Sequence, residues 1–311
     1  MKRKIIQQGN NSYTVTLPIK WVREQGLEDN EVEINEEDGR IVISIPEGAK
    51  KKGNFVRVNL GKYHPRTIKS ILNGFYRKGF DKVTIGFESK EQLDQIKKST
   101  RDLLGFEVVE EDEKHCVLQN IAEPSGEKYE AILRKVFLSI KEDSQEMLES
   151  WKKGTLKDTK KYEESKNLVD TYTNFCRRVI LKDKIGGSKE SYFNMILLSR
   201  LSLIYHSYYY LAKFISSKKK LKVNLEIMNI FSKCNEMFSL LMDAFYKQDL
   251  NILDKIAVMK ENTFNSEIYP LLQRCKGEDN VILYHLGEAI RLIQLTSINN
   301  FSLIDYDAKG A

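Results

Sequence analysis

The first part of the chain separates basic from acidic side chains on either side of Glu24. The basic residues before it are Lys2, Arg3, Lys4, Lys20 and Arg23. The acidic residues after it are Glu28, Asp29, Glu31, Glu33, Glu36, Glu37 and Asp38. Lysine and arginine neutralise phosphate groups, so a folded segment of this kind would offer a positive end to a polyanion. Presented twice by a dimer, that end is typical of a protein that binds duplex nucleic acid.

Motifs for catalysis are absent from the sequence. It contains no GxxxxGK[ST] loop, no HExxH motif and no GxSxG motif. Gly186-Gly187 indicates a turn between helices, because a phosphate-binding glycine loop would follow a strand. Carboxylates are not paired in a setting that would tune them for acid–base work. We therefore expect no enzymatic activity, no catalytic residue and no cofactor.

The cysteines give no sign of a metal or disulfide framework. All four are widely scattered, without a CxxC pair: Cys116, Cys176, Cys234 and Cys275. This spacing favours a reducing compartment. The start of the chain lacks the apolar core of a signal peptide. The most apolar stretch, Met195–Ile215, carries Arg200, His206 and Lys213, which are costly in a bilayer, so we expect a cytoplasmic protein without stable membrane insertion.

The hydrophobic period divides the chain into segments. Within residues 1–48 it predicts four short strands, at Ile5-Ile6, Tyr13–Leu17, Val32–Ile34 and Ile41–Ile45. Asp38-Gly39 predicts a hairpin between the last two. Pro18 to Gln25 is predicted to form a short helix that ends at Gly26. This segment is too small to bury an adequate core alone, so it must pack on the rest of the chain or on a second copy.

Residues 54–123 predict a small α+β domain. Its expected elements, in β-α-β-α-β-β order, are strand 55–60, helix 65–78, strand 82–87, helix 90–104, and strands 106–110 and 115–120.

From residue 127 to residue 300 apolar residues recur with a helical period. The expected six helices contain the stripes 129–140, 168–180, 192–215, 225–245, 253–272 and 281–298. Short connections between long helices favour an antiparallel bundle of two three-helix halves. Residues 301–311 are left as a C-terminal tail. The predicted fold class is therefore multidomain α+β.

The run RKIIQQGNNSYTVTLPIKWVREQGLEDNEVEINEEDGRIVI, residues 3–43, resembles the AbrB/SpoVT/MazE-antitoxin family of swapped-hairpin β-barrels. The resemblance rests on Gly9 with its polar loop, Ser12–Val15 leading into Leu17-Pro18, Trp21-Val22 in a short helix, and the Asp38-Gly39 hairpin. It implies that two chains interleave their hairpins into one barrel. It also implies DNA contact through Lys2, Arg3, Lys4, Asn10, Asn11, Ser12, Lys20 and Arg23. The cations would meet phosphates, and the asparagines would offer contacts to base edges.

Residues 127–300 resemble PhoU-type phosphate-uptake regulators in helix number, helix length and position after an AbrB-type segment, an arrangement similar to archaeal PhoU-related regulators. Members of that family carry E-x-x-x-D pairs that hold metal ions. This chain departs from the pattern. Lys166 precedes Asp170, Ser202 precedes His206, and Leu292 follows Glu288 at the matching spacing. We therefore expect no metal site, and treat these polar residues and the tyrosines at 205 and 208–210 as packed bundle residues.

These observations favour a homodimeric, DNA-binding transcriptional regulator of phosphate uptake, with a helical region that senses a ligand or a protein of phosphate transport or signalling. Two alternatives stay open. In one, the chain is an adaptor that regulates a phosphate transporter or kinase through its helices without binding DNA. In the other it is a MazE-like antitoxin, although such antitoxins usually carry a short disordered tail.

Overall fold

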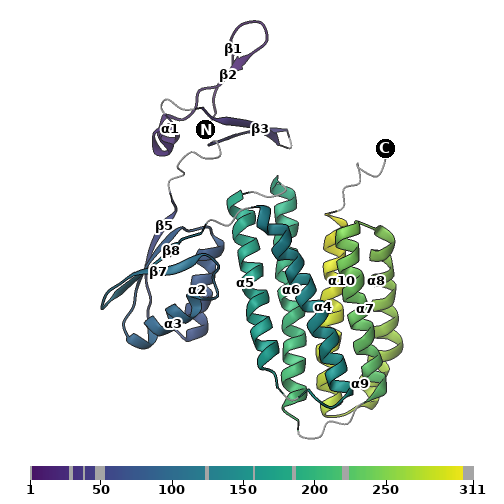
Figure 1. The fold of residues 1–311 in the computed structure, drawn as a ribbon. Coiled ribbons are helices and arrows are strands. Elements are labelled where there is room, and N and C mark those ends of the chain that lie inside the picture. Colours follow the sequence, from purple (N-terminus) through teal and green to yellow (C-terminus); the bar gives the residue numbers. More distant parts are fainter. Residues whose placement is uncertain are drawn as a thin grey trace. The chain divides into compact units, whose positions relative to one another are not determined.

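A computed structural model describes residues 2–27, 31–37, 39–45, 53–122, 126–156, 158–183, 187–218 and 224–303. The chain divides into two compact units, Met1–Asn54 and Phe55–Ala311. The first unit contains short strands and one short helix and the second is mostly helix, so the chain is a multidomain α+β protein (Figure 1). The segments 54–123 and 127–300 share the second unit, and the boundary between them remains a prediction.

The first unit contains two hairpins and one short helix. Strands β1 (Ile6–Gln7) and β2 (Tyr13–Thr14) form one antiparallel pair, and β3 (Glu33–Glu37) and β4 (Arg40–Ser44) form the other. Helix α1 (Ile19–Gln25) lies between them in the sequence and ends at Gly26, as predicted. Within one chain, the described strands of the first unit form two separate two-stranded sheets and do not close into a barrel.

The second unit begins with a four-stranded sheet in the order β5-β6-β8-β7. Its elements are β5 (Phe55–Asn59), α2 (Pro65–Arg77), β6 (Lys82–Gly86), α3 (Lys90–Thr100), β7 (Phe106–Glu111) and β8 (His115–Asn120). The predicted order of strands and helices is confirmed. β5 and β6 are parallel, as a crossover helix requires, whereas β8 is antiparallel to both of its neighbours.

Helices make up the rest of the described chain. They are α4 (Glu127–Lys152), α5 (Lys160–Asp183), α6 (Gly187–Ser216), α7 (Leu225–Lys247), α8 (Leu250–Thr263), the π-helical turn η1 (Phe264–Ile268), α9 (Tyr269–Arg274) and α10 (Glu278–Phe301). α4, α5 and α6 pack together, as do α7, α8 and α10, and the two groups meet where α4 contacts α7 and α6 contacts α10. One hydrophobic cluster runs through both groups. None of the described helices is both long and apolar enough to span a bilayer.

The predicted helix at 253–272 is divided by the π-helical turn. Pro270 has no N–H to donate within the helix, and a local widening of the helix accommodates a break of this kind. The Tyr269 N–H donates to the Phe264 carbonyl, five residues earlier, which is the π-helical pattern. The apolar stripe continues through the turn, so it did not reveal this change.

Arg178 on α5 joins the helices to the sheet segment. Its side chain is fully buried, and its guanidinium donates to the carbonyls of Tyr76 at 3.0 Å and Phe80 at 2.8 Å. It also pairs with Asp81 at 2.9 Å, and Lys182 reaches the same carboxylate at 2.7 Å. The guanidinium carbon lies 5.1 Å from the Tyr76 ring centroid. Pairing with Asp81 offsets the cost of burying this charge, although Arg178 Nε has no partner among the described residues, and the contact positions α5 against α2.

Candidate nucleic-acid interface

The loop between β1 and β2 is a tight turn that presents amide side chains. The Gln8 N–H donates to the Ser12 carbonyl at 2.9 Å, and the Ser12 hydroxyl donates to the Gln8 carbonyl. Gly9 has φ +73°, a conformation that glycine adopts without steric cost. Asn10 and Asn11 therefore occupy the turn with exposed side chains, at the end of the hairpin away from α1 (Figure 1).

Helix α1 carries the second group of basic residues. Pro18 precedes the helix with φ −64°, the value to which its ring restricts it. Lys20 and Arg23 are three residues apart, so they lie on one face of the helix. Lys20 approaches Glu24 at 3.8 Å, but both side chains are exposed, and such pairs contribute little. Lys20 thus remains accessible to a phosphate group.

All eight residues predicted to contact DNA have exposed side chains in the first unit. They fall into three groups: Lys2, Arg3 and Lys4 in the extended segment before β1, Asn10, Asn11 and Ser12 in the hairpin turn, and Lys20 and Arg23 on α1. The structure brings together the members within each group. Arg40 on β4 is also exposed, although the charge pattern of the sequence did not single it out.

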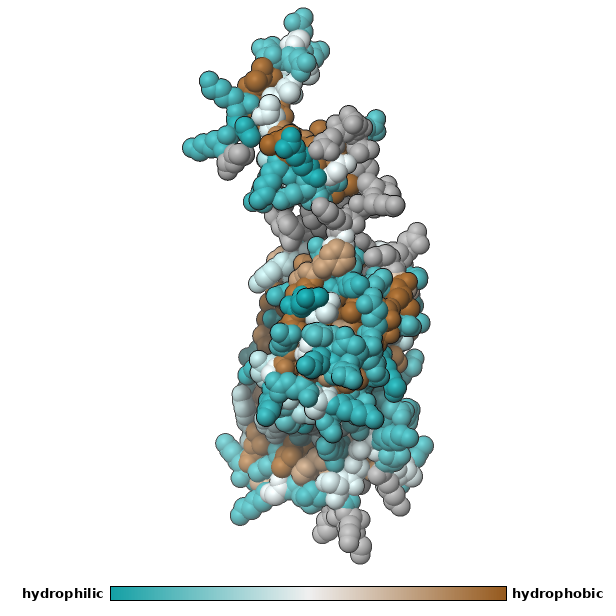
Figure 2. Space-filling view, turned by 90° about the vertical axis from the view of Figure 1, so that its left-hand side faces the viewer, coloured by the Kyte–Doolittle hydropathy of each residue, from teal (hydrophilic) through white to brown (hydrophobic). Residues whose placement is uncertain are grey.

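Large apolar side chains are exposed across the same unit. We name this set the apolar set; it comprises Ile5, Ile6, Tyr13, Val15, Ile19, Ile34 and Ile41, exposed by 46% to 73%. Figure 2 shows hydrophobic residues at the surface of this unit beside hydrophilic ones. Among its described residues Leu27 is the one buried hydrophobic side chain. Strand alternation in the sequence marked most of these positions but did not show that the single chain leaves them uncovered.

The second unit gathers the polar residues that the helical pattern had set apart. Asp170 on α5 accepts hydrogen bonds from Ser202 at 2.6 Å and from Lys166 at 2.8 Å, and its carboxylate lies 3.0 Å from His206 Nε2. Burial alone would raise the pKa of Asp170, but the hydrogen bond and charge of His206, together with Lys166, hold that pKa well below its ordinary value. The network therefore stabilises an ionised carboxylate between α5 and α6.

Glu288 and two of the tyrosines also have partners. Glu288 on α10 accepts a hydrogen bond from Ser207 at 2.9 Å. Tyr205 donates to Asp143 at 2.6 Å, and Tyr208 stacks on Phe231. Tyr205, Tyr208 and Tyr209 are buried, whereas Tyr210 is about half exposed. Within the described ranges, no group of three or more metal-ligating side chains comes together.

Comparison with known proteins gives a family match for the N-terminal segment. Residues 6–53 match the family model described as "Antidote-toxin recognition MazE, bacterial antitoxin". Neither the curated proteins nor the solved structures give a significant match to the chain. The match covers the exposed groups at the hairpin turn and on α1, and most of the apolar set. The chain therefore carries a MazE-type antitoxin domain at its N-terminus, followed by a largely helical region.

Proposed function

We propose that the protein is a DNA-binding transcriptional regulator that acts as a homodimer through its MazE-type domain. The observation that carries this proposal is the coincidence of that domain with exposed basic and amide side chains in three groups. Lysine and arginine at the N-terminus and on α1 would neutralise phosphates, and Asn10 and Asn11 would reach base edges from the tip of the hairpin.

The exposure of the apolar set supports the proposal that the protein is a dimer. A segment that buries one hydrophobic side chain among its described residues lacks the apolar burial that a stable small domain needs. In the proposed dimer, two chains interleave their hairpins into one closed barrel and cover Ile34 and Ile41. The barrel would then present two copies of each basic group, which suits the pseudo-symmetry of duplex operators.

For the helical region we propose a sensor or partner-binding role in phosphate uptake, without enzymatic activity. The support is architectural: long helices in two packed groups that follow the MazE-type domain. The partnered state of Asp170, His206 and Glu288 is consistent with a bundle that binds no metal at these positions.

Salt dependence of binding tests the proposal. Full-length protein is titrated against fluorescent duplexes of its own upstream region and of phosphate-gene promoters, over a series of salt concentrations. Replacing Arg3 and Lys4 by alanine should reduce the slope of log K against log salt by about 2, one unit per phosphate contact. Lys152→Ala with Lys153→Ala removes the same charge from exposed positions at the end of α4 and should leave the slope unchanged. Salt-independent binding, or no binding to any of these duplexes, contradicts the proposal.

A second candidate function is that of an antitoxin, which the matched family model favours. An antitoxin would bind a small toxin protein and neutralise it. Co-expression with neighbouring open reading frames separates the two: rescue of growth from a toxic neighbour supports the antitoxin, whereas promoter binding without such a neighbour supports the regulator. Deleting residues 1–48 tests the adaptor alternative, because an adaptor would keep its regulatory effect.

A further inference from the structure

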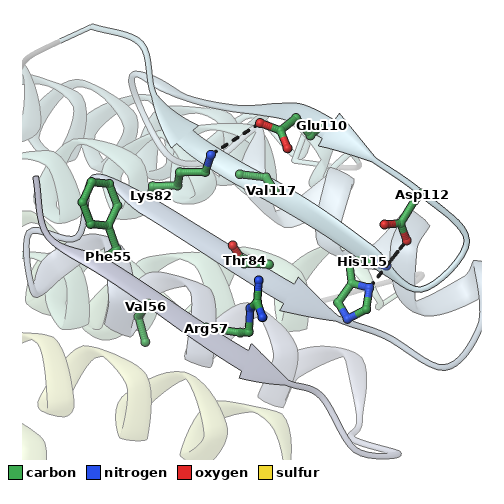
Figure 3. A pocket seen from close by; sticks show the side chains of 9 residues that line it. All are labelled: Phe55, Val56, Arg57, Lys82, Thr84, Glu110, Asp112, His115 and Val117. Atoms are coloured by element: carbon green, nitrogen blue, oxygen red, sulfur yellow. Dashed lines mark hydrogen bonds and ion pairs between the residues drawn. The ribbon is translucent and has the colours of Figure 1, made fainter.

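The sheet of the second unit has one covered face and one open face. Helices α2 and α3 pack on the face formed by Val83, Ile85, Cys116 and Leu118, all of which are buried. The opposite face holds a shallow hollow of about 590 Å³ (Figure 3). It is lined by Phe55, Val56, Arg57, Lys82, Thr84, Glu110, Asp112, His115 and Val117. The volume is in the range of sites that bind small molecules.

Strand register places an aromatic side chain and a cation on the same face of β5, towards opposite ends of this hollow. Phe55 and Arg57 both point to the open face from β5, because side chains two residues apart share a face. They are separated by roughly 6–7 Å along the strand. Arg57 lies opposite Thr84, which lies opposite Val117, so small side chains form the floor beside it. His115 and Arg57 lie at the end away from Phe55 (Figure 3).

Two groups of the hollow, the Arg57 guanidinium and the His115 imidazole, are available to bind a ligand. Among the described residues, the Arg57 guanidinium has no carboxylate or hydrogen-bond partner. The Asp112 carboxylate accepts the backbone N–H groups of Lys114 and His115, both at 2.7 Å, and lies 3.6 Å from His115 Nδ1. These contacts orient the imidazole, and its Nε2 is without a partner in the described part of the chain. Lys82 is paired with Glu110 at 3.4 Å.

Phe55 is 66% exposed, whereas Val56 and Val58 on the helix-facing side of the same strand are partly buried. The hollow thus has an exposed aromatic ring towards one end and, towards the other, a guanidinium without a partner among the described residues. This arrangement suits a ligand with a flat ring at one end and an anionic group at the other. We propose that the open face of this sheet binds a nucleoside monophosphate. Its base stacks on Phe55, its phosphate is held by Arg57 and His115, and the Lys82–Glu110 pair meets the polar edge of the base.

The same face favours a free nucleotide over a nucleic-acid strand. Platforms that bind single strands stack successive bases on two or more aromatic side chains. Among the described residues that line this hollow, Phe55 is the one phenylalanine, tyrosine or tryptophan, and the His115 imidazole lies at the other end. Glu110 and Asp112 stand on its rim and would repel a continuous phosphate backbone. The proposed ligand is therefore an effector whose binding is independent of DNA binding by the first unit.

Isothermal titration of the full-length protein, without DNA, tests this inference. AMP, GMP, CMP and UMP are titrated separately, with inorganic phosphate, adenosine and a single-stranded oligonucleotide as further ligands. At least one nucleotide should bind saturably at one site per chain, more tightly than phosphate or adenosine. Arg57→Ala should weaken this binding by roughly tenfold to a hundredfold, the size expected for a charge-assisted hydrogen bond.

Further variants separate the ring contact from general effects. Phe55→Ala should weaken nucleotide binding by roughly tenfold while leaving the weak binding of phosphate unchanged. Arg66→Ala, which removes an exposed arginine from α2, is the matched control and should bind like the parent protein. Circular dichroism checks that all variants are folded. The inference is overturned if no nucleotide binds saturably, if phosphate alone binds as tightly, if the oligonucleotide binds more tightly, or if Arg57→Ala and Arg66→Ala are indistinguishable.

Discussion

The two units of the chain differ in how much of their apolar surface they bury. In the second unit, residues from every long helix contribute to one continuous buried cluster, and a smaller cluster fills the space between the sheet and its helices. The first unit buries Leu27 among its described residues and exposes seven large apolar side chains. Both units have ordinary local features, such as tight hairpin turns and capped helices. The difference lies in whether their apolar side chains are buried or exposed.

The stability of the two units should therefore depend on different kinds of contact. Stability in the second unit comes from contacts within one chain, so it should not depend on protein concentration. In the proposed dimer, stability in the first unit comes from contacts with another chain, so it should follow mass action.

Ile41→Asp should dissociate the dimer. Ile41 is 73% exposed in the single chain, so a charge there costs the monomer little. Covered by a second chain, the same charge would be buried without a partner, and the dissociation constant should rise more than about a hundredfold. Analytical ultracentrifugation of the full-length protein measures this change. DNA binding should be lost with the dimer.

Val258→Asp is the matched control, since Val258 is 51% exposed on α8 of the second unit. It introduces the same charge and should leave the dissociation constant unchanged. Equal dimerisation of the two variants would show that the apolar set of the first unit is not the dimer interface.

Arg178→Ala should lower the free energy of unfolding of the second unit by about 3 kcal/mol. The substitution removes the Arg178 donor from the carbonyls of Tyr76 and Phe80 and the Arg178 cation from Asp81. Lys182→Ala removes the Lys182 cation from the same carboxylate and should cost about 1 kcal/mol. Urea unfolding followed by circular dichroism measures both values. If the two variants are equally stable, Arg178 does not anchor α5 to the sheet segment.

Arg178 also marks the limit of what the sequence could reveal. Local patterns predicted the strands and helices of residues 55–120 and the hairpin at Gly39, which has φ +71°, because these depend on neighbouring residues. Asp38 of that hairpin signal lies outside the described residues. The partners of Arg178 lie about a hundred positions earlier in the chain, and no local pattern connects them.

The candidate interface was predictable to a similar degree. The basic and amide residues that the family resemblance indicated are exposed, because each lies in a turn, a short helix or an extended segment whose form is set locally. In the proposed complex, how the three groups combine on a duplex depends on a second chain, and the sequence pattern contains no measure of that geometry. The open face of the sheet was missed because Phe55 and Arg57 show the same alternation as any strand that is buried on one side.

Asp170→Asn should lower the free energy of unfolding of the second unit by about 2 kcal/mol at neutral pH, since hydrogen bonds to a charged group are lost. The pKa of Asp170 lies below its ordinary value of 3.8 in the folded chain. A depressed carboxyl pKa adds stability above the unfolded value, and this stability is lost as the pH falls towards the folded value. The difference between parent and variant should therefore shrink as the pH falls below about 4. Urea unfolding across this range measures it, and a pH-independent difference would exclude the ionised carboxylate as its source.

A pair of glycine substitutions gives the smallest effect and the closest comparison of the two units. Helices α1 and α4 end in the same motif, with Gly26 and Gly154 at φ +66° and +67°. In each, the residue after the glycine donates to a carbonyl five positions earlier, Leu27 to Val22 at 3.0 Å and Thr155 to Ser150 at 2.8 Å. No atom lies within 4 Å of a Cβ added at either position, so the cost of alanine is the left-handed backbone alone, about 1 kcal/mol.

The same local cost should appear in different measurements. Gly154→Ala should lower the midpoint of thermal unfolding of the second unit by roughly 2–4 °C, independent of protein concentration. Gly26→Ala should leave that midpoint unchanged and raise the dimer dissociation constant roughly fivefold, because folding of the first unit is linked to association. Calorimetry at several protein concentrations and ultracentrifugation read the two effects separately. If Gly26→Ala instead lowers a concentration-independent midpoint, the first unit folds without a partner, and the contrast between the two units fails.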